Sequence, residues 1–205
     1  MAVDSPWPHS SLKRFLDLLG SMLLLLLLWP LMIVIALGVF ISLGKPVIFR
    51  QERPGKNGRI FHLCKFRTLK GTETDTEKPG GKIPPNAFTK LIRFCGLDEL
   101  PELWNIVKGD MSFVGPRPLL VRYLERYSDE QNRRHNVLPG LTGLAQVKGR
   151  NAVDWEERLK WDVLYVEKST LQMDATILWQ TLTLIGRGEG ANVSSEFLGT
   201  DNETH

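Results

Sequence analysis

Residues 18–44 read LLGSMLLLLLLWPLMIVIALGVFISLG and contain no charged side chain. An uncharged apolar run of this length is typical of a membrane-embedded helix rather than of the core helix of a soluble domain. A cleaved signal peptide is disfavoured, because its apolar region is shorter and is followed by small residues, whereas this run ends in Ile41-Ser42-Leu43-Gly44. Residues 1–44 are therefore predicted to form a membrane-embedded segment.

The pair Trp29-Pro30 divides this run near its middle, and proline interrupts helical hydrogen bonding. Each of the two limbs covers about 18–21 Å, less than the roughly 30 Å of a hydrocarbon core. A sharp kink would make the helix re-entrant, whereas a mild kink would leave a single-span anchor. Basic residues on both sides, such as Arg14 and Lys45, favour two cytoplasmic ends and thus a re-entrant helix broken at Pro30.

The rest of the chain predicts an α+β domain on the cytosolic side. Alternation and turn residues predict a short β-hairpin over residues 47–67, and helical periodicity predicts several amphipathic, interfacial helices. These helices are expected at residues 88–94, 100–107, 118–134, 153–168 and 171–185. A single cytosolic domain is assigned to residues 45–185, and residues 186–205 to a polar, disordered tail.

Charge and composition narrow the class of ligand. Between Lys45 and Lys70 eight residues are basic and only Glu52 is acidic, which suits an anionic lipid surface or a phosphorylated ligand. Nucleic acid is not expected, because no nucleic-acid-binding motif accompanies the charge. The two cysteines form no metal-ligand spacing and are expected to be free thiols in a reducing cytosol. Six tryptophans are many for this length, and those on the amphipathic helices fit a lipid headgroup layer or the core of a small domain equally well.

The segment Leu97-Asp98-Glu99-Leu100-Pro101 places two adjacent carboxylates at an expected helix start. The structural interpretation is that Asp98 caps the helix and that Glu99 is an acid favoured by the helix dipole. The functional interpretation is that Asp98 attacks phosphorus to form a covalent intermediate, with Glu99 handling protons or assisting metal binding. A diphosphate substrate would normally bring Mg²⁺, which prefers carboxylate and phosphate oxygens.

Two further segments carry arginines that could bind phosphate. Prolines on both sides hold Arg117 in a stiff turn, where its guanidinium could grip phosphate oxygens or simply be solvated. The glycine-rich residues 139–149 lead to Arg150 and could cradle a phosphate, although isolated glycines are weak indicators of such a site.

Taken together and in order, the motifs resemble the bacterial sugar transferase family of monotopic phosphoglycosyl transferases. The resemblance runs from about Lys13 to about Leu184, and it is strongest to small single-domain members such as the enzyme that initiates bacterial N-linked glycan assembly. The motifs are Lys65-Phe66-Arg67-Thr68, Asp98-Glu99-Leu100-Pro101-Glu102-Leu103, Lys108-Gly109-Asp110-Met111-Ser112, Gly115-Pro116-Arg117-Pro118 and Pro139-Gly140-Leu141-Thr142-Gly143-Leu144-Ala145-Gln146.

The resemblance implies a two-step transfer at the cytoplasmic face of a bacterial inner membrane. Asp98 would attack the β-phosphate of a UDP-sugar, release UMP and keep the phosphosugar until polyprenyl phosphate, such as undecaprenyl phosphate, accepts it. Glu99 would complete the catalytic dyad, and Asp98 would also contact Mg²⁺. The basic residues expected to bind the substrates or brace the dyad are Lys65, Arg67, Arg93, Arg117 and Arg150. Asp162 and Asp174 lie in matching stretches, but the resemblance assigns them no role.

One departure concerns the helix break, which is a Ser-Pro pair in the family and Trp29-Pro30 here. A serine hydroxyl can bond a carbonyl freed by the kink, and tryptophan cannot. The alternatives to this function are a non-catalytic membrane adaptor and a polytopic transferase. A non-catalytic membrane adaptor would not need the intact Asp98-Glu99 pair, and a polytopic transferase would need many apolar segments where the sequence has one.

Overall fold

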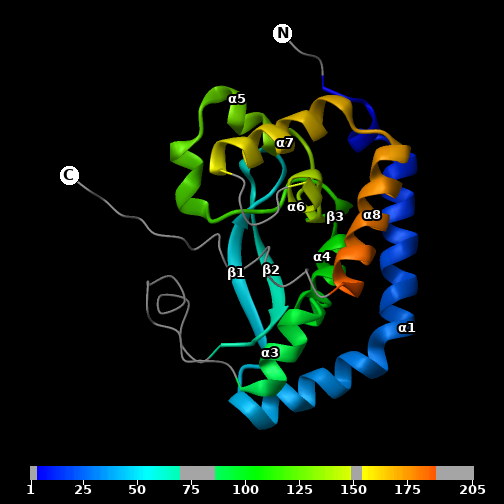
Figure 1. Cartoon of the computed structure of the whole chain (residues 1–205), viewed down its shortest axis with the longest axis vertical. Helices are drawn as coiled ribbons and strands as arrows, with labels where there is room; N and C mark the ends of the chain where they lie inside the picture. Colours follow the sequence, from blue (N-terminus) through cyan, green and yellow to red (C-terminus); the bar gives the residue numbers. More distant parts are fainter. Residues whose placement is uncertain (1–3, 70–85, 149–153, 188–205) are drawn as a thin grey trace, which may run out of the picture.

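The computed structural model of the chain describes residues 4–69, 86–148 and 154–187. It combines one long apolar N-terminal helix, shorter helices and two small two-stranded sheets (Figure 1). The helices are α1 (Ser11–Leu43), α3 (Ala87–Phe94), α4 (Glu102–Lys108), α5 (Asp129–Asn132), α6 (Leu144–Lys148), α7 (Trp155–Lys168) and α8 (Leu171–Gly186). Short 3₁₀ helices are η1 (Trp7–His9), η2 (Lys56–Gly58), η3 (Leu97–Glu99), η4 (Val121–Arg126) and η5 (Arg133–Asn136).

Helix α1 is continuous over 33 residues, with Pro30 inside it. The Ser10 side chain caps its first turn by accepting a hydrogen bond from the Lys13 amide, and Gly44 ends it with a positive φ of 72°. Figure 1 shows that α1 bends part-way along and follows the side and the base of the domain. A proline inside a helix is the commonest cause of such a bend. The helix thus continues through Pro30, and its re-entry into a membrane stays a prediction.

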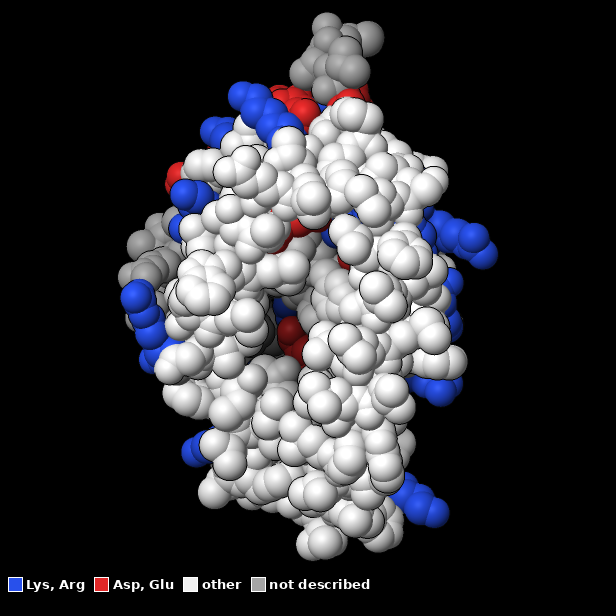
Figure 2. Space-filling view, turned by 90° about the vertical axis from the view of Figure 1, so that its right-hand side faces the viewer, with Lys and Arg blue, Asp and Glu red and all other residues white. Residues whose placement is uncertain are grey.

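The outer side of α1 is almost entirely apolar. The helix is long and apolar enough to cross a membrane, and only 11% of its most apolar window is buried in the domain. A core helix of a soluble protein would be mostly buried, so this helix presents its leucines outward. Figure 2 shows a broad face without Lys or Arg on the side of α1 and α8, with basic side chains along its edges. Exposed side chains include Leu26, Leu27, Trp29, Trp179 and Leu182.

The inner side of α1 packs on the hairpin and on the helices around the predicted dyad. Ile35 and Val39 are buried with Phe66 of the hairpin and Ile92 of α3. Phe88 of α3 lies so close to Gly38 that a Cβ at this glycine would overlap the ring. The second half of the membrane helix is therefore part of the core and not a detached anchor.

The predicted hairpin is confirmed. Strands β1 (Ile48–Pro54) and β2 (Ile60–Phe66) pair antiparallel from Ile48↔Phe66 to Pro54↔Ile60. Its inner face buries Phe61 and Leu63 against α4. This packing fixes the end of β2, where Lys65 lies, beside the start of α4.

A second sheet joins β3 (Ser112–Val114) and β4 (Gly140–Thr142) in parallel. The residue after β3, Gly115, donates its amide to the Thr142 carbonyl at 2.9 Å. The two chains approach so closely that a Cβ at Gly140 would overlap the Gly115 backbone. The described glycines of residues 139–149, a possible phosphate cradle by sequence, therefore allow close packing of the backbone.

The prediction of one amphipathic helix over residues 118–134 is wrong. The chain there forms η4, α5 and the start of η5, and Tyr127 between the first two is extended. Ser128 starts α5 with a capping box, in which its side chain and the Gln131 side chain each accept from the other's backbone amide. This local alternative interrupts the longer periodic pattern. The other predicted helices are confirmed, with bounds shifted by one or two residues.

Candidate active site

The Asp98-Glu99 dyad lies in η3, between α3 and α4. Gly96 precedes it with a φ of 67°, a left-handed conformation that turns the chain sharply after α3. The predicted N-cap role of Asp98 is wrong, because α4 begins at Glu102 with Pro101 at its N-cap and no side-chain cap. The dyad is thus displayed on a tight 3₁₀ turn that precedes the helix.

Glu99 is held by two cations from different parts of the chain. Its Oε1 accepts from Lys65 Nζ of β2 at 2.6 Å and from Arg117 Nη2, which follows β3, also at 2.6 Å. Burial alone would raise the pKa of Glu99, but the charges of Arg117 and Lys65 lower it well below its usual range. Glu99 is therefore an ionised anchor that fixes both cations.

Asp98 has a different environment. In the part of the chain that the structure describes, its carboxylate forms no ion pair. Burial, followed by the charge of Glu99, raises the pKa of Asp98 to about 6, and the positive charges of Lys65 and Arg93 oppose this rise. A carboxylate that is poorly solvated and unpaired, yet ionised near neutral pH, can act as a nucleophile.

A third acid, Glu102, completes the cluster and was given no role from the sequence. It is 2% exposed, and its Oε1 lies 3.1 Å from Lys65 Nζ without hydrogen-bond geometry. Burial raises the pKa of Glu102 to about 7, with Lys65 opposing and Glu99 adding to the shift. The spacing of three acids within five positions among leucines was the signal available in the sequence.

Of the five predicted basic residues, Lys65 and Arg117 contact Glu99, and Arg93 lies near enough for its charge to lower the pKa of Asp98. Arg67 is placed differently, because its guanidinium donates to the carbonyls of Leu43 and Gly44 at the end of α1. It thereby satisfies carbonyls that a helix C-terminus leaves without partners. Arg150 lies outside the described residues.

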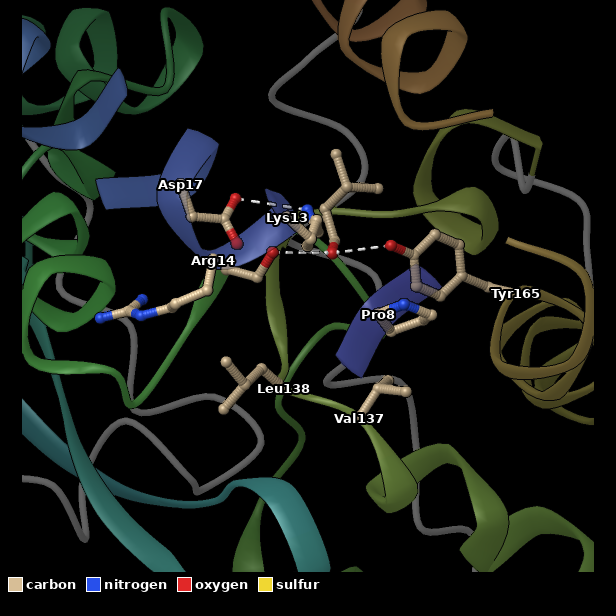
Figure 3. Close-up of a pocket in the computed structure, with 9 residues that line it drawn as sticks. Pro8, Lys13, Arg14, Asp17, Val137, Leu138 and Tyr165 are labelled. Carbon is tan, nitrogen blue, oxygen red and sulfur yellow. Dashed lines mark hydrogen bonds and ion pairs between the residues drawn. The ribbon is translucent and has the colours of Figure 1, made fainter. Parts of the chain in front are cut away.

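A second buried polar cluster fastens the start of α1 to the domain (Figure 3). Lys13 Nζ lies 2.9 Å from Asp174 Oδ2 of α8 and 3.3 Å from Asp17 Oδ1, and all three side chains are buried. Asp17 also accepts the Phe113 amide of β3 at 3.2 Å. Figure 3 shows Lys13 and Asp17 pointing toward one another, whereas Arg14 points away. The cluster gives Asp174, which the sequence left without a role, a structural one.

Arg14 connects α1 to α4. Its guanidinium donates to the carbonyls of Ile106 at 2.7 Å and Val107 at 3.0 Å, in the last turn of α4. The cavity beside this cluster measures only about 20 Å³, too small for a substrate. The region is therefore a structural joint between α1, β3, α4 and α8.

The geometry of the dyad is compatible with phosphoryl transfer. One carboxylate is unpaired and desolvated, the other orients Lys65 and Arg117, and both cations can neutralise phosphate charge. Among the described residues, no three His, Cys, Asp or Glu side chains are arranged to hold a metal on their own. A separate hollow of about 480 Å³ lies beside β1 and η4, and the dyad does not line it.

Comparison with known proteins identifies the group to which this arrangement belongs. A sequence profile of bacterial sugar transferases matches residues 8–188, nearly the whole described chain. The chain belongs to the bacterial sugar transferase family. The matched residues include α1, the dyad, Lys65, Arg93 and Arg117.

Three relatives illustrate the range of this family. EpsL of Bacillus subtilis, named an uncharacterized sugar transferase, is 42% identical over 184 residues, which cover 87% of this chain and 89% of that protein. The undecaprenyl-phosphate galactose phosphotransferase of Salmonella typhimurium is 37% identical over 198 residues, or 88% of this chain and 41% of that protein. The UDP-glucose:undecaprenyl-phosphate glucose-1-phosphate transferase of Klebsiella pneumoniae is 37% identical over 181 residues, or 83% of this chain and 39% of that protein. The chain thus spans about two fifths of the last two.

Proposed function

We propose that the protein transfers a sugar-1-phosphate from a UDP-sugar to undecaprenyl phosphate through a covalent intermediate on Asp98. The observation that carries this proposal is the contrast within the dyad: Glu99 is bound by Lys65 and Arg117, whereas Asp98 is partly buried and forms no ion pair with any residue that the structure describes. Relatives whose names specify UDP-glucose and undecaprenyl phosphate are 36–37% identical to this chain over 179–181 residues.

In the first step, an oxygen of the Asp98 carboxylate attacks the β-phosphorus of the donor. The bond between this phosphorus and the oxygen bridging the two phosphates breaks, and UMP leaves with the bonding electron pair. In the second step, a phosphate oxygen of undecaprenyl phosphate attacks the same phosphorus, and the Asp98 carboxylate leaves. The products are UMP and undecaprenyl diphospho-sugar, and Asp98 is regenerated.

The cations around the dyad have distinct tasks in this scheme. Arg117 and Lys65 neutralise the charge of the diphosphate, and Glu99 keeps their heads in place between turnovers. Arg93 lies close enough to lower the pKa of Asp98 and thus favours its ionised form. Pre-organised charge of this kind is commonly a large part of catalysis.

We also propose that the enzyme uses Mg²⁺. Glu99 is engaged by two cations and Glu102 is deeply buried, so Asp98 is the acid available to such an ion. One carboxylate together with substrate phosphate oxygens is a usual Mg²⁺ environment, and the ion would neutralise diphosphate charge there.

We further propose that α1 enters and leaves the membrane on the cytoplasmic side. Arg14, near the start of α1, binds α4, and the end of α1 is bound by Arg67 beside β2. A span that separated the two ends would force part of this one domain across the bilayer. The bend of α1 and the apolar face over α1 and α8 fit a domain that lies on the membrane (Figures 1 and 2). Undecaprenyl phosphate could then reach the site from the lipid surface.

A UMP-release assay with a panel of UDP-sugars, Mg²⁺ and undecaprenyl phosphate tests the proposal. We expect release with at least one sugar, and we expect Asp98→Asn to abolish it. Because burial makes the ionised form of Asp98 unfavourable, this variant should melt no lower than the wild type at pH 7. Asp129→Asn, an exposed acid at the start of α5, is the matched control and should be fully active. Retained turnover by Asp98→Asn would refute the nucleophile, and a wild type inactive toward every sugar would favour an adaptor.

A further inference from the structure

The position of the Arg117 guanidinium depends on the backbone of Arg117, which lies outside any helix or strand. Arg117 follows β3 in Gly115-Pro116-Arg117-Pro118, and the flanking residues 116–120 have no regular secondary structure. The prolines restrict φ but supply no amide donors. The Gly140 amide fixes the Pro116 carbonyl at 3.0 Å, and side chains fix the carbonyls of Arg117 and Pro118.

A buried arginine supplies such a contact. Arg134 of η5 is 2% exposed, and its Nη2 donates to the Arg117 carbonyl at 2.6 Å. The same guanidinium donates to Asp162 Oδ2 of α7 through Nε at 3.0 Å and Nη2 at 2.7 Å. Asp162 is itself 4% exposed. The chain of contacts runs from α7 through Arg134 to the backbone of the residue that grips Glu99.

An ordinary structural ion pair does not account well for this arrangement. A buried ion pair often adds no net stability over apolar packing, because both charges lose their hydration. The same two elements are already joined by Arg133 Nη1 and Glu167 Oε1 at 2.6 Å, nearer the surface. The buried pair differs from this one in its direct bond to Arg117.

We propose that Arg134 and Asp162 are positioning residues that aim the Arg117 guanidinium at Glu99 and at the donor phosphates. This inference rests on the proposed function. The planar guanidinium of Arg134 can serve Asp162 and the Arg117 carbonyl together, and a lysine ammonium cannot reproduce that fork. Asp162 accepts from Nε and Nη2 of Arg134 and so fixes the orientation of the guanidinium plane. A displaced Arg117 would leave the dyad intact but would misalign the charge that faces the diphosphate.

The first measurement is the burst of UMP from enzyme given a UDP-sugar without acceptor. We expect Arg134→Lys and Asp162→Asn to slow the burst roughly ten- to a hundredfold, as displacements of catalytic groups commonly do. Glu167→Gln removes the neighbouring ion pair between the same elements and should stay within about twofold of the wild type. Melting temperatures are recorded for every variant, so that loss of folded protein is not mistaken for displacement of the Arg117 guanidinium.

The second measurement separates positioning from general support. Arg134→Lys is repeated in an Arg117→Lys background, where the guanidinium to be aimed is absent. A positioning role predicts that Arg134→Lys then slows the UMP burst little or not at all. A structural role predicts that it slows the burst by the same factor in both backgrounds. An equal loss in both, or a normal burst from Arg134→Lys alone, would overturn the inference. No burst from the wild type with any sugar would instead count against the proposed function itself.

Discussion

At the scale of single residues, the dyad shows how two adjacent carboxylates acquire opposite properties. Glu99 and Asp98 occupy the same 3₁₀ turn, yet two cations bind one carboxylate and leave the other unpaired. The pKa of Glu99 is lowered in consequence, and that of Asp98 is raised to about 6 by burial and by its neighbour's charge. Pairs whose environments move their pKa values apart commonly divide catalytic roles in this way.

The raised pKa of Asp98 predicts an acid limb in the first half-reaction. Only the ionised carboxylate can attack phosphorus, so with subsaturating donor and Mg²⁺ the UMP burst should fall as pH drops through about 6, approaching tenfold per pH unit below it. Burst rates between pH 5 and 8 measure this limb. Glu102→Gln removes the other acid that titrates near neutrality and should leave the acid limb in place. A rate that stays constant down to pH 5 would contradict the assignment.

The sequence predicted this site in part. The dyad and the cations Lys65, Arg93 and Arg117 followed from the resemblance, and the structure brings them together. The placement of Arg67 at the end of α1 did not follow, because a side chain's partner is set by tertiary packing and not by its motif. Arg134 and Asp162 lie 28 positions apart and meet only in the folded chain.

At the scale of elements, α1 is joined to the domain by its polar ends and by its inner face. Arg14 binds the last turn of α4, Lys13 pairs with Asp174 of α8, and Asp17 accepts an amide of β3. The first two turns of α1 are thus bound to α4, α8 and β3.

This joint predicts a large loss of stability when Lys13 is replaced by methionine. The substitution keeps the apolar stem but leaves Asp17 and Asp174 buried without their shared cation. Removing one partner of a buried pair commonly costs about 3–5 kcal/mol. Urea unfolding in detergent measures the difference, and Lys160→Met, an exposed position on α7, should stay within about 0.5 kcal/mol of the wild type. An equally small change for Lys13→Met would show that the cluster is not structural.

Element boundaries were predictable where caps and turns marked them. Gly109 stops α4 with a φ of 92°, and Asp154 caps α7 by accepting from the Trp155 amide. Residues 118–134 were not predicted correctly, because the amphipathic period continues through a place where Ser128 and Gln131 close a separate capping box. A local hydrogen-bond alternative there outweighs periodicity.

At the scale of the whole molecule, the exposed apolar side chains of α1 and α8 fit the proposal that the domain rests on a lipid surface. Trp104 of α4 and Trp179 of α8 are each more than half exposed, which favours the headgroup-layer role over the core role for these two. Figure 2 shows acidic atoms at the bottom of a hollow in the apolar face, so polar groups are reachable from that side.

The re-entrant topology predicts that both ends of α1 are cytoplasmic. In a background without Cys64 and Cys95, single cysteines at His9 and Arg50, both exposed, should be shielded from a thiol reagent that reaches only the periplasm. Both should react once the membrane is permeabilised. Labelling of one site alone in intact cells would establish a spanning helix and exclude re-entry.

The central claim, a phosphosugar bonded to Asp98, is tested most directly by intact-mass analysis of enzyme given an accepted UDP-sugar and Mg²⁺ without undecaprenyl phosphate. The account predicts a species heavier by one phosphosugar, absent from Asp98→Asn and discharged when undecaprenyl phosphate is added. An enzyme that never gains this mass, under conditions where product forms as soon as acceptor is supplied, would contradict it.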